Sequence, residues 1–345
     1  NKDIKYEFSV VWLKINDIFV YMKRNIAVLM GGFSSEKEIS IKSGMVIYNH
    51  IDRDLYNPYK IIISKEKWIY IDDNDNEHNI SKNDFSVNIN NNKIKFDIAF
   101  IIIHGSPGED GLIQSYLELI GIPYTGCDPY SSAITFNKRN CISFLQKYDI
   151  PAAKSIHLNL GDEIDENQII KKIGIPCFVK ANKSGSSLGV YKVNHKKNLI
   201  SSIENSFKID NEVLIESFLD GIEVSVGVMN YKNEIIVLGI TQLITENDFF
   251  DYEAKYQGKS KEITPANISE IQKNNVTEMA IKIYKKLGLK GFSRSEFIFV
   301  GDIPYFLEIN SIPGMTNESI FPKQAEVNGI SLKDLCSEVI AQAVK

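Results

Sequence analysis

Two apolar, strand-like segments near the C-terminus, Gly291–Val300 and Tyr305–Asn310, constrain the fold of this chain more than any other feature. The residues that join them, Val300-Gly301-Asp302-Ile303-Pro304, are typical of a turn. The two segments therefore predict an antiparallel hairpin. Successive side chains of a strand point to opposite faces, so every second residue shares a face.

Polar side chains gather on one face of this predicted hairpin. Arg294 and Glu296 share a face of the first strand, and Glu308 and Asn310 share a face of the second. If the turn leaves three residues unpaired, Glu296 lies opposite Glu308 and Arg294 opposite Asn310. Carboxylate and amide oxygens are hard ligands that Mg²⁺ accepts alongside substrate phosphates. The alternative is an ordinary ion pair in which Arg294 neutralises Glu308, and the hairpin alone favours that alternative.

The N-terminal third has the pattern of an open α/β sheet. Ile26–Met30 and Phe96–Ile103 are apolar runs typical of buried parallel strands, and each is followed by a polar loop. Helix patterns follow the loops Gly31–Ser40 and His104–Gly111. Ligands of open α/β sheets bind beyond the carboxyl ends of the strands, where both loops are expected.

Two further units follow in the chain. One long helix is expected at Ser131–Tyr148, and after Pro151 short strands and helices predict a small α+β unit. Long alternating strands at Ile222–Met229 and Glu234–Leu243 open a third unit, which includes the C-terminal hairpin. We therefore expect an N-terminal extension without an assigned role and three domains, at residues 1–23, 24–126, 127–217 and 218–345.

Composition excludes several classes of protein. The formal net charge of −5 argues against a general nucleic-acid binder. No uncharged apolar run approaches the length needed to span a membrane, so no membrane partner is expected. The four cysteines are widely spaced without a C-x-x-C pair, which indicates thiols in a reducing, cytoplasmic compartment.

A glycine- and serine-rich segment, Lys183–Gly189, lies between two predicted strands. It lacks the G-x-x-x-x-G-K-[ST] pattern, which excludes a Walker P-loop. Such a hairpin tip can still cover phosphates with backbone amides and hydroxyls, although a merely mobile hairpin is the better reading of this motif alone. Lys180 ends the preceding apolar strand, where its ammonium group either binds an anion or extends to solvent.

Two other segments carry polar groups that suit a nucleotide. The segment Leu214–Glu223 contains Glu216 at the end of a strand and Glu223 beyond it. These two glutamates either bind adenosine or simply close the strand. Phe250–Tyr256 lies in a long loop of the kind that often forms a lid, with Lys255 placed to meet a phosphoryl group. Polar residues at strand ends beside carboxylates favour phosphoryl transfer, in which the protein positions groups and neutralises charge.

Together these motifs resemble those of the D-alanine–D-alanine ligase family, which has the ATP-grasp fold. The resemblance runs from about Arg24 to the C-terminus. Its markers, in chain order, are Gly31–Ser40, His104-Gly105, Gly108–Gly111, Pro123–Gly126, Gly185–Gly189, Asp251–Tyr256 and the stretch from Tyr305 through Pro313-Gly314-Met315-Thr316. The resemblance implies a three-domain ATP-grasp protein of α/β and α+β class, with an open parallel α/β domain at the N-terminus.

The resemblance also implies the activity and its residues. ATP would be bound by Lys138, Lys180, Ser187, Glu216, Phe218, Leu219, Glu223 and Lys255, and two Mg²⁺ ions, with Mn²⁺ as an alternative, by Glu296, Glu308 and Asn310. D-Alanine would be bound by Glu36, His104, Gly314, Ser319 and Ile320. The catalytic set would be Glu36, Ser186, Arg294, Ser319 and Tyr256. The implied reaction joins two D-alanines through a D-alanyl phosphate, for peptidoglycan precursor synthesis, in a cytoplasmic homodimer.

Within this resemblance the chain departs from the usual pattern at three positions. Glu296 stands where the first metal ligand is commonly aspartate, which leaves the coordination geometry open. Ala181-Asn182 follows Lys180 where Pro-Ser is usual, and Pro107 stands where glycine is frequent. A rival activity joins D-alanine to D-lactate or D-serine. Relatives that make D-alanyl-D-lactate tend to carry histidine at the position of Tyr256, so tyrosine favours the dipeptide. A non-catalytic nucleotide-binding scaffold is the other alternative.

Overall fold

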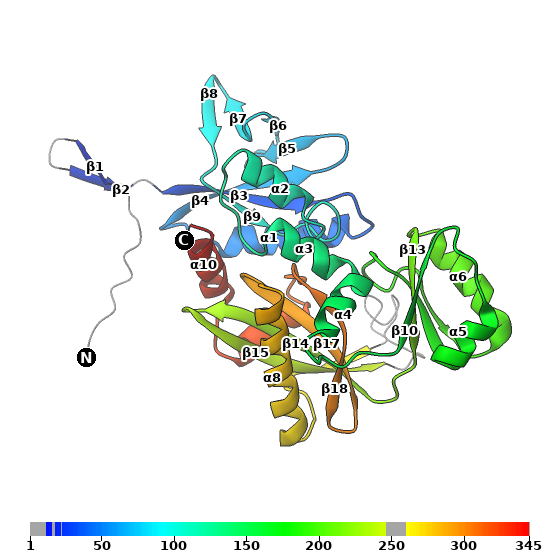
Figure 1. Cartoon of the computed structure of the whole chain (residues 1–345). Helices are drawn as coiled ribbons and strands as arrows, with labels where there is room; N and C mark the ends of the chain where they lie inside the picture. Colours follow the sequence, from blue (N-terminus) through cyan, green and yellow to red (C-terminus); the bar gives the residue numbers. More distant parts are fainter. Residues whose placement is uncertain (1–11, 16–17, 22, 246–259, 345) are drawn as a thin grey trace.

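The computed structural model describes residues 12–15, 18–21, 23–245 and 260–344 of the chain. Its strands form four sheets, of which the smallest is a two-stranded ribbon of β1 (Trp12–Ile15) and β2 (Ile18–Tyr21). The other three have seven, four and five strands and correspond to the three units that the sequence pattern predicts (Figure 1). None of the helices in the described part is long and apolar enough to cross a membrane.

The N-terminal sheet has the strand order β8-β7-β6-β5-β4-β3-β9. Only its β4-β3-β9 part is parallel, and residues 77–95 supply the antiparallel strands β6 to β8. The elements of this unit are β3 (Arg24–Gly31), α1 (Lys37–His50), β4 (Tyr56–Ile63), β5 (Trp68–Ile71), β6 (Glu77–Ser81), β7 (Ser86–Ile89), β8 (Asn92–Lys95), β9 (Ile98–Ile101) and α2 (Leu112–Leu119). The loops after β3 and β9 leave the same edge of the sheet, because parallel strands end together.

The central sheet is antiparallel, with the order β10-β13-β11-β12, and packs against two helices. Its elements are β10 (Ser155–Asn159), α5 (Glu166–Ile173), β11 (Cys177–Ala181), β12 (Val190–Val193), the 3-10 turn at Lys196–Asn198, α6 (Leu199–Phe207) and β13 (Glu212–Ser217). The glycine-rich segment connects β11 to β12, which agrees with the hairpin that the sequence predicts.

The C-terminal sheet is also antiparallel, in the order β16-β15-β14-β17-β18. Its elements are β14 (Ile222–Tyr231), β15 (Glu234–Thr245), β16 (Ser260–Ile263), α8 (Glu270–Lys286), β17 (Phe292–Val300), β18 (Ile303–Asn310), α9 (Ile320–Val327) and α10 (Leu332–Ala343). The last helix, α10, packs against α1 and β9 of the N-terminal unit, so the two units share one core. The predicted domain boundaries remain a prediction.

The segment expected as one helix at Ser131–Tyr148 forms two helices, α3 (Pro129–Phe136) and α4 (Lys138–Gln146). Asn137 separates them because its backbone is extended (φ −91°, ψ 97°) and its side chain accepts a backbone N–H from the first turn of α4. Asparagine favours this capping position over a helix interior. The break makes Lys138 the first residue of α4. Both helices pack against β18.

The register of the C-terminal hairpin is as predicted, but for a different reason. Glu296 pairs with Glu308 and Arg294 with Asn310. The turn leaves two residues unpaired rather than three, since Val300 pairs with Ile303. Further along the hairpin, an irregularity in β18 adds one residue to that strand and so restores the predicted pairing.

That irregularity is a β-bulge at Leu307. Phe297 pairs with Phe306, whereas the next pair is Glu296 with Glu308, so Leu307 is the extra residue. Without it, Glu296 would lie opposite Leu307, and Glu308 would project from the other face of the sheet. The bulge therefore decides that the two carboxylates share a face.

Phe306 holds this hairpin on the core, because its fully buried ring packs edge-on against Phe297 at a centroid distance of 6.0 Å. We expect Phe306→Ala to lower the free energy of unfolding by about 3–5 kcal/mol. Thermal unfolding followed by calorimetry measures the loss. Ile303→Ala is the matched control on the same strand, since that side chain is 52% exposed and its truncation should cost less than about 0.5 kcal/mol. Equal effects of both variants would contradict this packing.

Candidate active site

A cavity of about 350 Å³ lies where the three large units meet. Its walls come from α1, the loop after β9, the start of α4, the glycine-rich loop, the end of β13 and the hairpin face. Most of the residues assigned by resemblance line it, namely Glu36, His104, Lys138, Lys180, Ser186, Ser187, Glu216, Leu219, Glu223, Arg294, Glu296, Glu308, Asn310, Gly314, Ser319 and Ile320.

Three assigned residues are not found there. Lys255 and Tyr256 lie outside the residues that the structure describes. Phe218 is described, but its ring contacts Phe178 and Lys192, and its amide donates to the carbonyl of Pro176. A role for Phe218 in binding a nucleotide therefore stays a prediction.

The ion pairs on the hairpin face differ from the pair of Arg294 with Glu308 that the sequence left as the alternative to a metal site. Arg294 Nη1 lies 2.6 Å from Glu296 Oε1, on its own strand. Glu308 Oε2 instead lies 3.2 Å from Lys138 Nζ, which reaches across from α4. The break between α3 and α4 explains this difference, because it directs Lys138 at the start of a helix toward β18.

A buried serine that the sequence did not single out completes this cluster. Ser225 lies on β14 directly opposite Glu296. Its hydroxyl accepts a hydrogen bond from Arg294 Nη1 at 3.2 Å and donates to Glu296 Oε1 at 3.3 Å. Ser225 therefore fixes the orientation of both charged groups. Only the order of the strands reveals it, since nothing in the sequence pairs Ile222–Tyr231 with the hairpin.

Lys180 and Glu216, expected to contact phosphates and adenosine, form an ion pair of 2.6 Å across β11 and β13. Burial lowers the pKa of the Lys180 ammonium, but the adjacent Glu216 carboxylate more than offsets this and raises it above its usual value. Glu216 Oε1 is buried and has no hydrogen-bond partner among the described residues. A buried carboxylate oxygen of this kind needs a donor, such as the amino group of a purine.

The glycine-rich loop reaches from the central unit to the N-terminal unit. Ser186 and Ser187 both have positive φ, at 52° and 58°, which serine rarely adopts. Ser186 Oγ donates to Glu36 Oε1 at 2.5 Å. A side chain at Gly185 would collide with the same carboxylate, since an added Cβ would lie 2.5 Å from Glu36 Oε2. The loop conformation thus depends on this contact with α1.

His104 ties the N-terminal unit to the segment after β18. Its Nδ1 lies 2.9 Å from the carbonyl oxygen of Ile312, which can only accept, so Nδ1 carries a proton. Nε2 then accepts from Ser43 Oγ at 3.1 Å. Burial lowers the pKa of His104, so the ring is neutral at neutral pH. Because both nitrogens are engaged, a substrate contact would have to replace one of these bonds.

The start of α9 presents free backbone amides to the cavity. Ser319 is its N-cap residue, but its hydroxyl does not bond within the helix and instead lies 2.8 Å from Thr316 Oγ1 and accepts from the Thr316 amide. Helix N-termini of this kind bind anions such as carboxylates. Gln324, fully buried, fixes α9 on the sheet by donating to the carbonyl of Ser225.

The hairpin face suits a metal ion that substrate phosphates complete. Among the described residues, no three His, Cys, Asp or Glu side chains gather to hold a metal by themselves. Glu308 and Asn310 both line the cavity, however, and Glu296 lies beside them. Mg²⁺ commonly takes one or two carboxylates, with phosphate and water oxygens as its other ligands. This donor set therefore fits Mg²⁺.

Sequence comparisons agree with this arrangement. Residues 25–127 match the family model described as D-ala D-ala ligase N-terminus, and residues 144–341 match the D-ala D-ala ligase C-terminus. The D-alanine–D-alanine ligase of Flavobacterium johnsoniae is 57% identical over 317 residues, which cover 92% of this chain and 98% of that protein. The chain belongs to the D-alanine–D-alanine ligase family. The family and the enzyme class inferred from the motifs are thereby confirmed.

Solved structures of D-alanine–D-alanine ligase relatives confirm the ATP-grasp fold. D-alanyl-alanine synthetase A from Vibrio cholerae is 30% identical, with a TM-score of 0.84 over 94% of this chain and all of that one. The D-alanine–D-alanine ligase from Bacillus anthracis, complexed with ATP, is 28% identical, with a TM-score of 0.75 over 93% of this chain and 97% of that one.

One buried carboxyl group of this D-alanine–D-alanine ligase fold has a strongly shifted pKa. Glu109 lines the cavity and accepts the Gly105 amide at 2.6 Å. Burial, and then the nearby charge of Glu36, raise its pKa from 4.5 to about 8. Its sequence neighbours, Gly108 and Asp110, gave no sign of this burial.

This shift predicts a pH-dependent stability. The folded chain binds a proton at Glu109 that the unfolded chain releases above its ordinary pKa of 4.5. The stabilisation is complete below that pH and is lost as the pH rises through about 8. The Glu109→Gln variant lacks this loss of stability. The difference between its thermal midpoint and that of the wild type (variant minus wild type) should therefore increase from pH 5 to pH 9. The exposed Glu204→Gln on α6 is the control. A flat difference for Glu109→Gln would contradict the shift.

Proposed function

We propose that the chain uses ATP to join two D-alanine molecules into D-alanyl-D-alanine. The observation that carries this proposal is the single cavity face on which Arg294, Glu296, Glu308 and Asn310 meet Lys138. Membership of the D-alanine–D-alanine ligase family supports the substrate. The reaction supplies a precursor of peptidoglycan in the cytoplasm, and the working form is a homodimer.

ATP lies between the central and C-terminal sheets. Phe178, Ile298 and Leu307 offer apolar walls for the base, and the buried Glu216 Oε1 accepts from its amino group. Glu223 binds the ribose hydroxyls, with Phe218 and Leu219 at the edge of the base. Lys138, Lys180 and Ser187 meet the phosphates, as does Lys255, which lies outside the described residues. The Bacillus anthracis relative, solved in complex with ATP, supports ATP as the nucleotide.

Glu296, Glu308 and Asn310 would hold two Mg²⁺ ions, or Mn²⁺ in their place. Bound there, such ions would supply positive charge that neutralises the phosphates of ATP. Glu296 is already oriented by Arg294 and Ser225, which suits a ligand whose arm is longer than aspartate. Asn310 Oδ1 also accepts the Ile312 amide, which fixes the oxygen in place.

In the first step, a carboxylate oxygen of the first D-alanine attacks the γ-phosphorus of ATP. The bond from that phosphorus to the β-phosphate oxygen breaks, so ADP leaves and D-alanyl phosphate remains. Glu36 binds the ammonium of this D-alanine, with His104 beside it. Ser186 holds Glu36 by its hydrogen bond and, with Tyr256, covers the acyl phosphate against water.

In the second step, the amine of the second D-alanine attacks the acyl carbon and loses a proton. Negative charge develops on the carbonyl oxygen, where Arg294 and the amide of Gly314 stabilise it. The carbon–oxygen bond to the phosphate then breaks, releasing inorganic phosphate and the dipeptide. Ser319 and the amide of Ile320, at the start of α9, bind the carboxylate of the second D-alanine.

A product assay tests this proposal. The protein is incubated with ATP, Mg²⁺, D-alanine and an equal concentration of D-lactate or D-serine, and the products are identified by mass. We expect D-alanyl-D-alanine as the main product at neutral pH, together with one ADP and one phosphate per dipeptide. D-Alanyl-D-lactate or D-alanyl-D-serine as the main product would contradict the choice of second substrate. Folded protein whose phosphate release is not stimulated by D-alanine would indicate a scaffold.

A further inference from the structure

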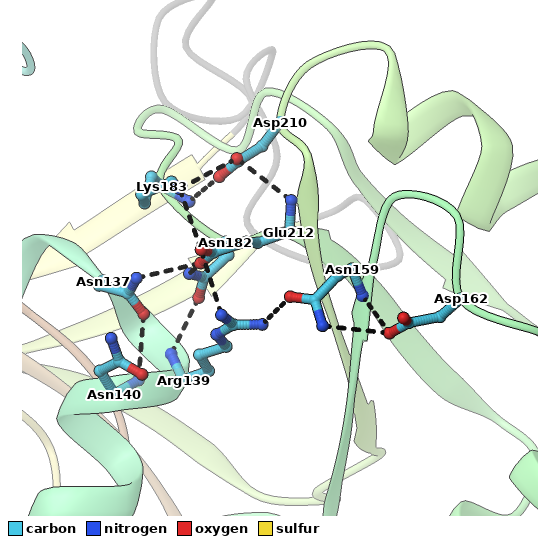
Figure 2. A network of polar contacts seen from close by, with 9 residues as sticks. All are labelled: Asn137, Arg139, Asn140, Asn159, Asp162, Asn182, Lys183, Asp210 and Glu212. Atoms are coloured by element: carbon cyan, nitrogen blue, oxygen red, sulfur yellow. Dashed lines mark hydrogen bonds and ion pairs between the residues drawn. The ribbon is translucent and has the colours of Figure 1, made fainter.

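A polar network lies at the base of the glycine-rich loop, outside the residues that line the cavity (Figure 2). Its centre is Glu212, the first residue of β13. Glu212 Oε1 lies 3.1 Å from the guanidinium of Arg139 and 3.3 Å from Lys183 Nζ. Glu212 Oε2 accepts hydrogen bonds from Asn137 at 3.0 Å and from Asn182 at 2.7 Å. One carboxylate therefore contacts four side chains from two separate segments.

The first of these segments is the start of α4. Asn137 caps this helix, and its amide nitrogen is the group that donates to Glu212. The backbone N–H of Arg139 donates to Asn182 Oδ1 at 2.9 Å. Both sequence neighbours of Lys138 are thus bonded to the network, which fixes the backbone from which Lys138 extends.

The second segment is the base of the glycine-rich loop. Asn182 is fully buried, and its own N–H donates to the backbone carbonyl of Glu212 at 3.0 Å. The N–H of Lys183 donates to Asp210 Oδ2 at 2.7 Å. The side chain of Asn182 donates to Glu212 and accepts from the Arg139 N–H at the same time. A serine has a single hydroxyl on a shorter arm and cannot reach both groups.

Lys138 connects the two segments again at its other end. Its Nζ donates to the carbonyl oxygen of Ser184 in the glycine-rich loop at 2.6 Å and lies 3.2 Å from Glu308 Oε2. The backbone of Lys138 and the loop that receives its ammonium are therefore both fixed to Glu212. Burial raises the pKa of Glu212, but Lys183 and the Asn137 hydrogen bond hold it below its usual value, so the carboxylate is ionised at neutral pH.

We propose that Glu212 is a positioning residue for ATP, which holds Lys138 and the glycine-rich loop in the geometry that meets the phosphates. This inference rests on the proposed function, because it takes ATP as the ligand of Lys138. Glu212 does not line the cavity, so it acts through the residues that it holds. Its loss should therefore weaken the binding of ATP and leave the binding of D-alanine unchanged.

A double-mutant cycle tests this role. Glu212→Gln keeps the shape of the side chain but removes its charge, and Lys138→Met removes the ammonium that Glu212 positions. We expect Glu212→Gln to raise KM for ATP about tenfold in the wild-type background, since small displacements of positioned groups weaken binding strongly. In the Lys138→Met background it should raise KM for ATP less than about twofold, because groups that act as one unit are not additive. KM for D-alanine should not change in either background.

Controls separate positioning from a general loss of structure. Asp162→Asn alters the far end of the same network, where the Asp162 carboxylate accepts hydrogen bonds from Asn159 and from no other described residue, and should leave both KM values unchanged. If Glu212→Gln does not fold, Asn182→Ala replaces it in the same cycle, with the same expected pattern. The proposal would be overturned if the two substitutions raised KM for ATP independently, so that their effects multiplied in the double variant. An equal rise of KM for D-alanine would also overturn it.

Binding of ADP, measured by calorimetry without D-alanine, distinguishes this inference from the proposed function. If wild-type protein binds ADP and makes dipeptide while Glu212→Gln binds ADP equally well, the positioning role fails and the ligase function stands. If wild-type protein makes no dipeptide yet Glu212→Gln weakens ADP binding only when Lys138 is present, the ligase function fails and the positioning role stands.

Discussion

The bulge at Leu307 determines which side chains of the C-terminal hairpin face the cavity. A regular hairpin with the same two-residue turn would place Glu308 on the far face from Glu296. With the extra residue, Leu307 and Glu308 both line the cavity, one as an apolar wall and the other as a carboxylate. Site geometry therefore depends on a local backbone irregularity, which the buried rings of Phe297 and Phe306 hold in register on the opposite face.

Paired charges line the cavity around this hairpin. Lys138, Lys180 and Arg294 each contact a carboxylate of the cavity, namely Glu308, Glu216 and Glu296. None of these cations is left as an isolated buried charge, which would be costly. Under the proposed function, a triphosphate that entered with metal ions would exchange these contacts for its own without a large change in net charge. The pair of Lys138 with Glu308 joins α4 to the hairpin, whereas Lys180 with Glu216 lies within the central sheet and Arg294 with Glu296 lies within β17.

Sequence patterns predicted the units of the fold, because long apolar alternation and turn residues are local signals. The hairpin register was predicted correctly, although the predicted turn was one residue too long. The bulge at Leu307 compensates for this, and a bulge cannot be recognised within a run of apolar residues. The single helix predicted at Ser131–Tyr148 was wrong, because Asn137 has an extended backbone and caps α4 with its side chain instead of continuing the helix. Ser225 and Gln324 could not be foreseen, since their partners come from distant strands. Lys255 and Tyr256 remain predictions outside the described residues.

The central claim is that one face of this hairpin holds the metal and the reacting phosphate. A crystal structure with ADP, Mg²⁺ and a D-alanine analogue tests it most directly. We expect metal ions bound to Glu308, Asn310 and Glu296, with the adenine beside Glu216 and the analogue between Arg294 and Ser319. Metal ions bound away from the hairpin, or a structure in which Glu296 and Glu308 point to opposite faces, would contradict the account.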